Sequence, residues 1–202
     1  MQVDKVPVWR LLVTMSLRIR LYEEPILRAK GKKITTFDRS LGDLVQEMIV
    51  TMREAEGIGL AAQQIGRDIQ LCVIDVSECD DDFNYSLDGR RPPLDLIMPL
   101  AVVNPEIEYL DSPDTVFEEG CLSFPGIRGD VKRPSAIRLR YQDVDGNPHV
   151  LECDGILARC AQHEVDHLNG ILFIDRMSKK TRKKLEPSLK ELAQRSRATP
   201  VS

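Results

Sequence analysis

The chain has 202 residues, of which 42% are hydrophobic and 30% are charged, and its formal net charge is -4. This length and composition suit one globular domain, residues 1–202, with a sizeable core. The small negative charge gives no general attraction to DNA or to an acidic membrane surface, and no run approaches the roughly 20 apolar residues of a membrane span. We therefore expect neither DNA nor a membrane as a partner.

The cysteines and the N-terminus indicate the cell compartment. Five cysteines, an odd number, are spread along a chain large enough to need no disulfides, which favours a reducing cytoplasm. The N-terminus is mildly apolar, but Asp4, Arg10 and the lack of a small-residue cleavage pattern argue against a signal peptide. Regular patterns begin only after Met15, so residues 1–14 are predicted to be a loosely held extension.

The first regular pattern predicts an amphipathic helix over residues 38–55. Apolar side chains recur there at helical spacing, Asp38 is a suitable N-cap, and Gly57 follows the end. Residues 57–64 are mostly small, which allows the backbone to approach a ligand closely. Residues 69–76 are predicted to form a buried strand.

The middle of the chain alternates between loops and strands. Residues 78–98 are acidic, turn-rich and without periodicity, so they are predicted to be an exposed loop insertion, with a functional lid as the alternative. Strand character resumes at residues 100–103 and is interrupted at 118–126. It returns as a hairpin with one wet face, turning at Asp145-Gly146.

Two more helices are predicted in the C-terminal part of the chain. The central one is predicted to begin at Asp154 and to stop at Asn169. Ser178 can cap a last helix within residues 178–202, which Pro187 should kink or restart. These elements predict an α+β fold, with antiparallel β-sheets around the central helix and with an N-terminal and a C-terminal helix.

The central helix carries His163 and His167, with Glu164 beside the first. Residues four apart lie above one another on a helix, so both imidazoles can bind one metal ion, and Glu164 can reach a metal-bound water. Ile156 and Cys160 share this face, which should therefore point inward, where unpaired imidazoles are costly. The pattern predicts a hydrolytic metal site; two histidines with ordinary partners are the alternative.

The third ligand stays open from the residues alone. The candidates are Cys121, His149, Glu186 and Glu191. A downstream glutamate would follow the pattern of zinc peptidases, but both glutamates lie in the lysine-rich tail. Cys121 lies in an apolar break between strands, and a thiolate binds zinc or ferrous iron well, although a lone buried cysteine is often only a small hydrophobic residue.

Three segments resemble the signature motifs of the peptide deformylase family, in the family's order. They are Gly-Ile-Gly-Leu-Ala-Ala-Gln-Gln at 57–64, Glu-Gly-Cys-Leu-Ser at 119–123 and Gln-His-Glu-Val-Asp-His at 162–167. The similarity covers roughly residues 19–180. It implies hydrolysis of the N-formyl group from N-formylmethionyl nascent peptides, with release of formate.

At matching positions, the resemblance makes Cys121, His163 and His167 the ligands of one divalent metal ion. Ferrous iron is the family's usual metal, and the sequence does not choose between it and zinc, nickel or cobalt. The fourth place belongs to water.

The resemblance also implies the catalytic groups. Glu164 takes a proton as water attacks and then protonates the leaving amine. The Gln64 side chain and the Leu122 backbone N–H stabilise the oxygen that gains charge. Gln63 stands at a variable position of the family's motif.

The pocket for the methionine side chain is implied in the same way. Ile58, Ile156 and Cys160 match positions that line it, and Gly59 lets the backbone lie along a substrate bound as an extended strand. Arg159 stands where some relatives have an apolar residue. An arginine that reaches the surface is slightly favoured over one that shapes the pocket mouth.

Two charged features have alternative interpretations. Glu119 and Arg133 form either a pair that steadies the Cys121 segment or a surface salt bridge. The basic run at 179–184 is typical of a solvated helix face, with contact to ribosomal RNA as the functional alternative.

Two other functions remain as alternatives. One is an HExxH zinc peptidase that uses Glu186 or Glu191. The other is a catalytically inactive, metal-stabilised binding module, against which Glu164 argues, because a structural site does not need it.

Overall fold

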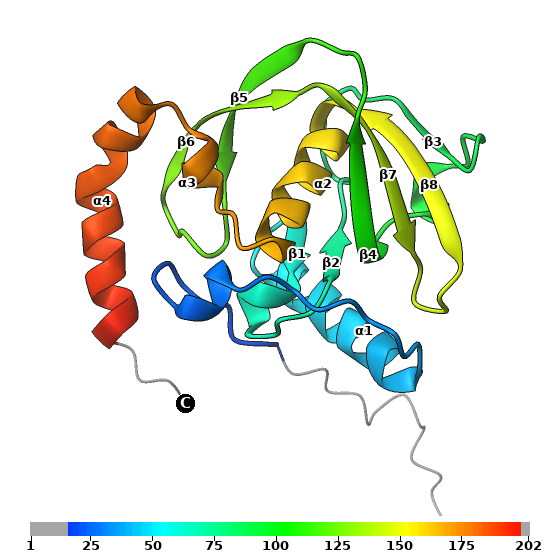
Figure 1. Cartoon of the computed structure of the whole chain (residues 1–202), viewed down its shortest axis with the longest axis horizontal. Coiled ribbons are helices and arrows are strands. Elements are labelled where there is room, and N and C mark those ends of the chain that lie inside the picture. Colours follow the sequence, from blue (N-terminus) through cyan, green and yellow to red (C-terminus); the bar gives the residue numbers. More distant parts are fainter. Residues whose placement is uncertain (1–15, 199–202) are drawn as a thin grey trace, which may run out of the picture.

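The computed structural model describes residues 16–198, in which helix α2 lies between two β-sheets (Figure 1). The larger sheet has six strands in the order β1-β2-β4-β7-β8-β3, and all neighbours are antiparallel. Its strands are β1 (Gly59–Ala61), β2 (Leu71–Ile74), β3 (Tyr85–Leu87), β4 (Leu100–Tyr109), β7 (Ala136–Gln142) and β8 (Pro148–Asp154). The smaller sheet pairs β5 (Asp114–Gly120) with β6 (Arg128–Pro134).

The helices cover these sheets. They are α1 (Arg39–Glu54), α2 (Gly155–Leu168), α3 (Phe173–Arg176) and α4 (Lys179–Ala198), with 3-10 turns η2 (Pro25–Arg28), η3 (Ala62–Ile65) and η4 (Leu94–Leu96). The predicted α+β class, with antiparallel sheets, is confirmed. The predicted extension at 1–14 lies outside the described residues. No helix within residues 16–198 is long and apolar enough to cross a membrane, and all five cysteines are free.

Strand β2 shows how the core is built on both faces of the larger sheet. Leu71 and Val73 pack in the cluster that contains the apolar face of α1. Cys72 and Ile74, which alternate with them, pack in the cluster that contains α2. The central helix is therefore fixed against the sheet by apolar contact, and its opposite side faces β5 and β6.

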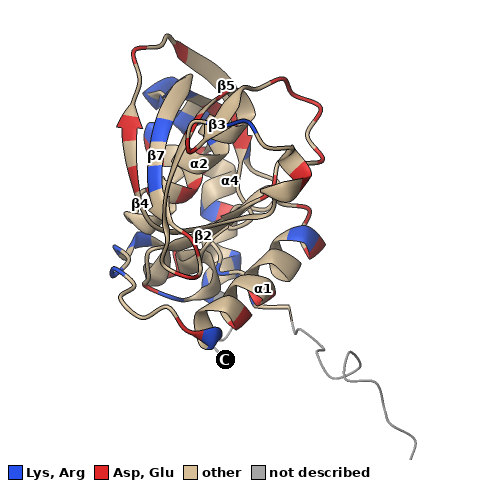
Figure 2. Ribbon diagram, turned by 90° about the vertical axis from the view of Figure 1, so that its right-hand side faces the viewer, with Lys and Arg blue, Asp and Glu red and all other residues tan. Residues whose placement is uncertain are grey.

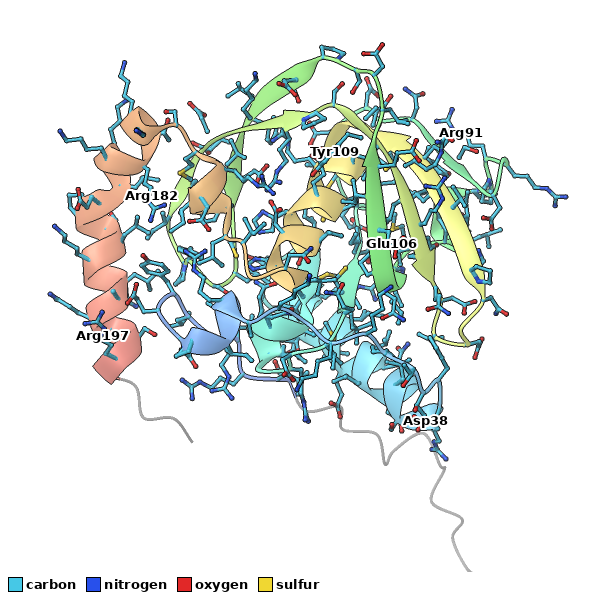
Figure 3. The ribbon with its side chains drawn as sticks, viewed as in Figure 1. Asp38, Arg91, Glu106, Tyr109, Arg182 and Arg197 are labelled. Atoms are coloured by element: carbon cyan, nitrogen blue, oxygen red, sulfur yellow. The ribbon has the colours of Figure 1, made fainter. Side chains whose placement is uncertain are left out.

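Helix α1 begins as predicted. The Asp38 carboxylate accepts hydrogen bonds from the backbone N–H groups of Ser40 (2.9 Å) and Leu41 (3.2 Å), which caps the helix. Figure 3 shows Asp38 at this end of α1.

Helix α2 begins directly after Asp154, as predicted, but the predicted capping hydrogen bond is wrong. The Asp154 side chain makes no cap hydrogen bond. It accepts instead from the backbone N–H (2.6 Å) and the side-chain amide (3.0 Å) of Asn84. Asp154 therefore holds the segment before β3 against the end of β8.

The exposed loop predicted for residues 78–98 is wrong in part. The segment contains β3, which pairs with β8 and completes the larger sheet. Tyr85, Leu87, Leu94 and Ile97 pack against the core cluster of α2. A strand of three residues is too short for its alternation to be distinguished from a loop.

Helix α4 is capped by Ser178, whose Oγ accepts from the N–H of Thr181 (3.0 Å). The helix continues through Pro187 without the predicted restart. Leu189 and Leu192 are buried against the smaller sheet and α3. The last helix is therefore attached to the domain by its own apolar side chains.

The hairpin of β7 and β8 has the predicted wet face. Arg138 and Arg140 alternate with buried apolar residues of β7, and both donate to Glu108 of β4 (2.9 and 2.8 Å). Figure 2 shows basic positions on β7 and acidic positions on β4, which pairs with it.

His149 of β8 lies between two carboxylates, with Nδ1 2.7 Å from Asp88 and Nε2 3.3 Å from Asp143. The hydrogen bond to Asp88 raises the pKa of His149, and burial opposes this only in part. Because the pKa is higher in the folded chain, the stabilisation is complete below the unfolded pKa of about 6.5 and is lost as the pH rises through the folded value.

We therefore expect His149→Gln to lower the Tm more at pH 5.5 than at pH 9. An exposed pair contributes up to about 1 kcal/mol, or about 2–4 °C for a chain of this size. Thermal unfolding at the two pH values measures the difference. Equal losses at both would contradict a charge contribution from His149.

Candidate metal centre

Helix α2 and the end of β5 bring three metal-binding side chains together. His163 and His167 lie one turn apart on α2, and Cys121 directly follows β5. Their ligand atoms all lie within 4.8 Å of one another, and the Cys121 Sγ is 3.2 Å from the His167 Nε2. Among the described residues, this is the one group of three such side chains that meets that distance.

The other candidates for third ligand lie elsewhere. His149 lies on β8, where it contacts the carboxylates of Asp88, just after β3, and of Asp143 in the β7–β8 turn. Glu186 and Glu191 lie on α4, where Glu186 pairs with Lys190 (3.4 Å). The downstream-glutamate arrangement of a zinc peptidase is therefore not formed.

The surroundings of the two histidines fit a metal ion. The His163 Nδ1 lies 3.0 Å from a Glu119 oxygen, which orients the ring and leaves Nε2 for a ligand bond. Burial lowers the pKa of His167 well below its usual value and keeps it in the neutral, ligating form. The His167 Nδ1 and the Glu164 Oε2 are buried without a hydrogen-bond partner in the described chain. One thiolate with two imidazoles suits zinc or ferrous iron.

Glu164 lies beside this group and is only 4% exposed. Burial raises the pKa of its carboxyl group to about 7. A side-chain Cβ at Gly59 would collide with the Glu164 carboxyl group and with the Cys160 sulfur, so glycine is required for β1 to pass this closely. A carboxyl group that titrates near neutral pH is suited to move a proton in both directions.

Gln64 presents its amide NH2 to the same place. Its Oε1 accepts from the backbone N–H of Ala61 (2.8 Å), so the amide orientation is fixed. Its Nε2 lies 3.2 Å from the Ser123 Oγ and 3.5 Å from the Cys121 Sγ. The donor end of Gln64 therefore faces the candidate metal ligands.

The backbone N–H of Leu122 is available at the site, whereas the side-chain amide of Gln63 is not. Leu122 follows Cys121, and within residues 16–198 its backbone N–H has no hydrogen-bond partner. The Gln63 amide turns away from the site, toward the carbonyl of Leu168 (3.4 Å). Only Gln64 of the two glutamines lies at the site.

A cavity of about 720 Å³ opens onto these groups. Gln64, Cys121, Leu122, His163 and Glu164 line it, and so do the four predicted pocket residues, which are Ile58, Gly59, Ile156 and Cys160. All predicted site residues except His167 therefore border one space.

A buried ion-pair network supports the Cys121 segment. Arg133 donates two hydrogen bonds to Glu119 (2.7 and 3.0 Å) and one to Asp166 (2.7 Å). Burial alone would raise the pKa of Glu119, but the hydrogen bonds from His163 and Arg133 outweigh it and hold the pKa well below its usual range. The surface salt bridge considered for Glu119 and Arg133 is wrong. Asp166 was missed because its position between the two histidines is not specified by the HExxH pattern.

The favoured interpretation of Arg159 is also wrong. The side chain does not reach the surface, since the residue is 7% exposed. Its two terminal nitrogens donate to Glu119 (2.8 Å), the Val131 carbonyl (3.2 Å), and the carbonyl (3.0 Å) and hydroxyl (2.8 Å) of Thr115. Four acceptors offset the cost of burying the charge, and nothing in the spacing of the sequence reveals them.

A thiolate and two imidazoles that converge beside a buried carboxyl group, at the wall of a cavity, define a metal-dependent hydrolase. Known proteins identify the family. The family model for polypeptide deformylase matches residues 16–183. The chain belongs to the peptide deformylase family, a metal-dependent family that hydrolyses the formyl amide at the start of newly made proteins.

Individual relatives agree over nearly the whole chain. A peptide deformylase of Opitutus terrae is 62% identical over 185 residues, which cover 91% of this chain and 96% of that protein. One of Methylacidiphilum infernorum is 42% identical over 178 residues, covering 88% and 93%. A solved peptide deformylase of Plasmodium falciparum has a TM-score of 0.77 at 37% identity, covering 91% of this chain and 99% of that one.

Proposed function

We propose that Cys121, His163 and His167 bind one divalent metal ion, with which the chain hydrolyses the formyl amide of N-formylmethionyl peptides. The observation that carries the proposal is the approach of their three ligand atoms within 4.8 Å, beside the buried Glu164. A bound metal ion supplies a Lewis acid and makes water nucleophilic at neutral pH.

Glu164 moves the proton in this proposal. Its carboxylate accepts a proton from the water that attacks the formyl carbon. The same carboxyl group then donates that proton to the amine as the C–N bond breaks, so that formate and a free N-terminus leave. The raised pKa of Glu164 makes both transfers accessible near neutral pH.

Gln64 and Leu122 stabilise the charge that develops on the formyl oxygen. We expect Gln64→Ala to lower kcat about 100- to 1,000-fold, because one donor to such an oxygen contributes about 3–4 kcal/mol. Formate-release kinetics and metal analysis would measure this, with KM and metal content changing little. Gln63→Ala is the matched control, since that amide faces away from the cavity; a similar loss of kcat in both variants would contradict the assignment.

The substrate lies in the 720 Å³ cavity in an extended form. Ile58, Ile156 and Cys160 provide apolar surface for the methionine side chain. The backbone at Gly59, at the free edge of the larger sheet, lies along the peptide.

The function is tested by anaerobic purification, metal analysis and an assay of formate release on a formyl-Met peptide. We expect formate and an intact peptide with a free amine. Cleavage of internal peptide bonds would favour a peptidase, and metal content without either product would favour a binding module. We propose ferrous iron as the metal, in which case activity should fall in air as the iron–thiolate site oxidises.

The basic face of α4 is proposed to contact ribosomal RNA close to emerging chains in the cytoplasm. Its cations at the start of the helix are Lys179, Lys180, Arg182, Lys183 and Lys184. Figure 3 labels Arg182 and Arg197 of this helix, which pair with Asp175 (3.2 Å) and Glu23 (2.9 Å), and the helix borders a cavity of about 470 Å³ that Tyr22 and Glu23 also line.

This contact is tested by replacing lysines and keeping the helix. Deleting α4 would uncover the core that Leu189 and Leu192 close, so a combined Lys179→Gln, Lys183→Gln and Lys184→Gln variant is preferable. We expect weaker ribosome co-sedimentation with a smaller dependence on salt, because each lost phosphate contact reduces the salt slope by about one. Unchanged binding would remove the proposal.

We further propose that residues 16–198 act as one domain, since β1, β5 and α2 all contribute to one cavity.

A further inference from the structure

Arg159 contacts every side chain that β5 turns toward α2. Alternate residues of a strand project to the same face, so Thr115, Phe117 and Glu119 share one face of β5. Arg159 donates to Thr115 twice (2.8 and 3.0 Å) and to Glu119 (2.8 Å). Between them, its guanidinium carbon lies 5.5 Å from the centre of the Phe117 ring. One side chain of α2 thus fixes the position of β5 across the cavity.

Phe117 and Arg159 both belong to the wall of the 720 Å³ cavity, together with Ile156 and Cys160. Phe117 is 44% exposed and is one of the residues that line this cavity. Strand β5 pairs with β6 alone, where Val131 lies opposite Phe117. The cation–π contact and the two hydrogen bonds to Thr115 link this strand to α2.

The metal ligands are supported separately. Glu119 orients His163 through its Oε2, and it accepts two hydrogen bonds from Arg133 in addition to the one from Arg159. Loss of the Arg159 guanidinium should therefore displace Phe117 and Thr115 more than it disturbs the metal site.

We propose that Arg159 is a specificity-determining residue, which positions Phe117 and thereby restricts the cavity to slender, unbranched first side chains such as that of methionine. This inference rests on the proposed use of the cavity by the first side chain of the substrate. A wider first side chain, such as phenylalanine, is excluded because the ring and the guanidinium hold β5 close to α2.

The test compares formyl-Met and formyl-Phe peptides of otherwise identical sequence. We expect Arg159→Met to reduce the ratio of kcat/KM for formyl-Met to kcat/KM for formyl-Phe about 10-fold, mainly through a lower KM for formyl-Phe, with one metal ion retained per chain. Phe117→Leu should give a similar reduction. The double variant should show no larger reduction of this ratio than either single variant, because Arg159 acts through Phe117.

Two further variants separate positioning from general stability. Arg159→Lys keeps the positive charge but lacks the planar guanidinium with its two terminal nitrogens. It should therefore not restore the wild-type ratio of kcat/KM values. Lys132→Met is the matched control, since Lys132 joins β6 to Asp114 of β5 through an ion pair (2.7 Å) between two residues that do not line the cavity. The ratio should stay at the wild-type value in this variant.

The outcomes are distinct. Additive effects of Arg159→Met and Phe117→Leu, or an unchanged ratio in metal-loaded Arg159→Met, would overturn the inference. If Arg159→Met does not fold, Phe117→Leu alone decides, and an unchanged ratio there overturns it as well. Failure of the unsubstituted chain to release formate would instead contradict the proposed function.

Discussion

Glu164→Ala is expected to lower kcat for formate release about 1,000-fold while the chain keeps its metal. The carboxyl group lies next to the three proposed ligands without being one of them, and burial raises its pKa to about 7. A positioned acid–base group typically contributes about 100- to 10,000-fold. Removing it takes away both proton transfers and leaves the thiolate and the imidazoles in place.

Glu164→Gln is the informative companion variant, because it keeps the shape of the side chain but cannot accept the proton. Both variants should bind metal at the wild-type ratio and show KM values close to wild type. The measurements are formate release under anaerobic conditions and elemental analysis of the same samples. Turnover near the parent level in either variant would show that another group moves the proton.

The parts of the site that the sequence predicts are those governed by local spacing. His163 and His167 are four residues apart, and an α-helix places such residues on one face whatever surrounds it. Asp38 caps α1 through bonds to its own next turn, so that boundary is also local. Cys121 differs, because spacing left it as one of four candidates, and the resemblance to a family selected it.

The missed features depend on contacts between distant segments. Arg159 is buried because β5 and β6 present four acceptors to it, from residues 28 to 44 positions away in the chain. Asp154 fails to cap α2 because Asn84 competes for its carboxylate. Strand β3 forms because the edge of β8 is available. Such contacts override local preference, and periodicity does not encode them.

Glu119 belongs to both groups, because its position was recognised in the sequence but its contacts were not. It lies within a recognised motif, yet its environment of two arginines and one histidine comes from three separate elements. Pairing stabilises the charged form of a buried carboxylate only when the partners are in place. The site is therefore a local helical pattern fixed in position by a long-range ionic network.

Cys121→Ala is expected to abolish metal binding and reduce formate release to background. The variant leaves two imidazoles, and structural or catalytic sites of this type need at least three protein ligands to retain the ion. The HExxH peptidase hypothesis predicts the opposite, namely that Cys121→Ala keeps its metal and that Glu186→Ala or Glu191→Ala loses it. Metal content per chain after dialysis separates the two hypotheses without any assay of activity.

Cys79→Ala is the matched control for loss of a thiol, because Cys79 is partly buried in the segment before β3 and lies outside the metal group. It should retain metal and activity, as should Glu186→Ala and Glu191→Ala. Metal retained by Cys121→Ala would exclude the thiolate as a ligand. Metal lost by Cys79→Ala would show instead that thiol substitution disturbs the fold. Only loss confined to Cys121→Ala supports a Cys–His–His centre, since the thiolate is then the one ligand that α2 does not supply.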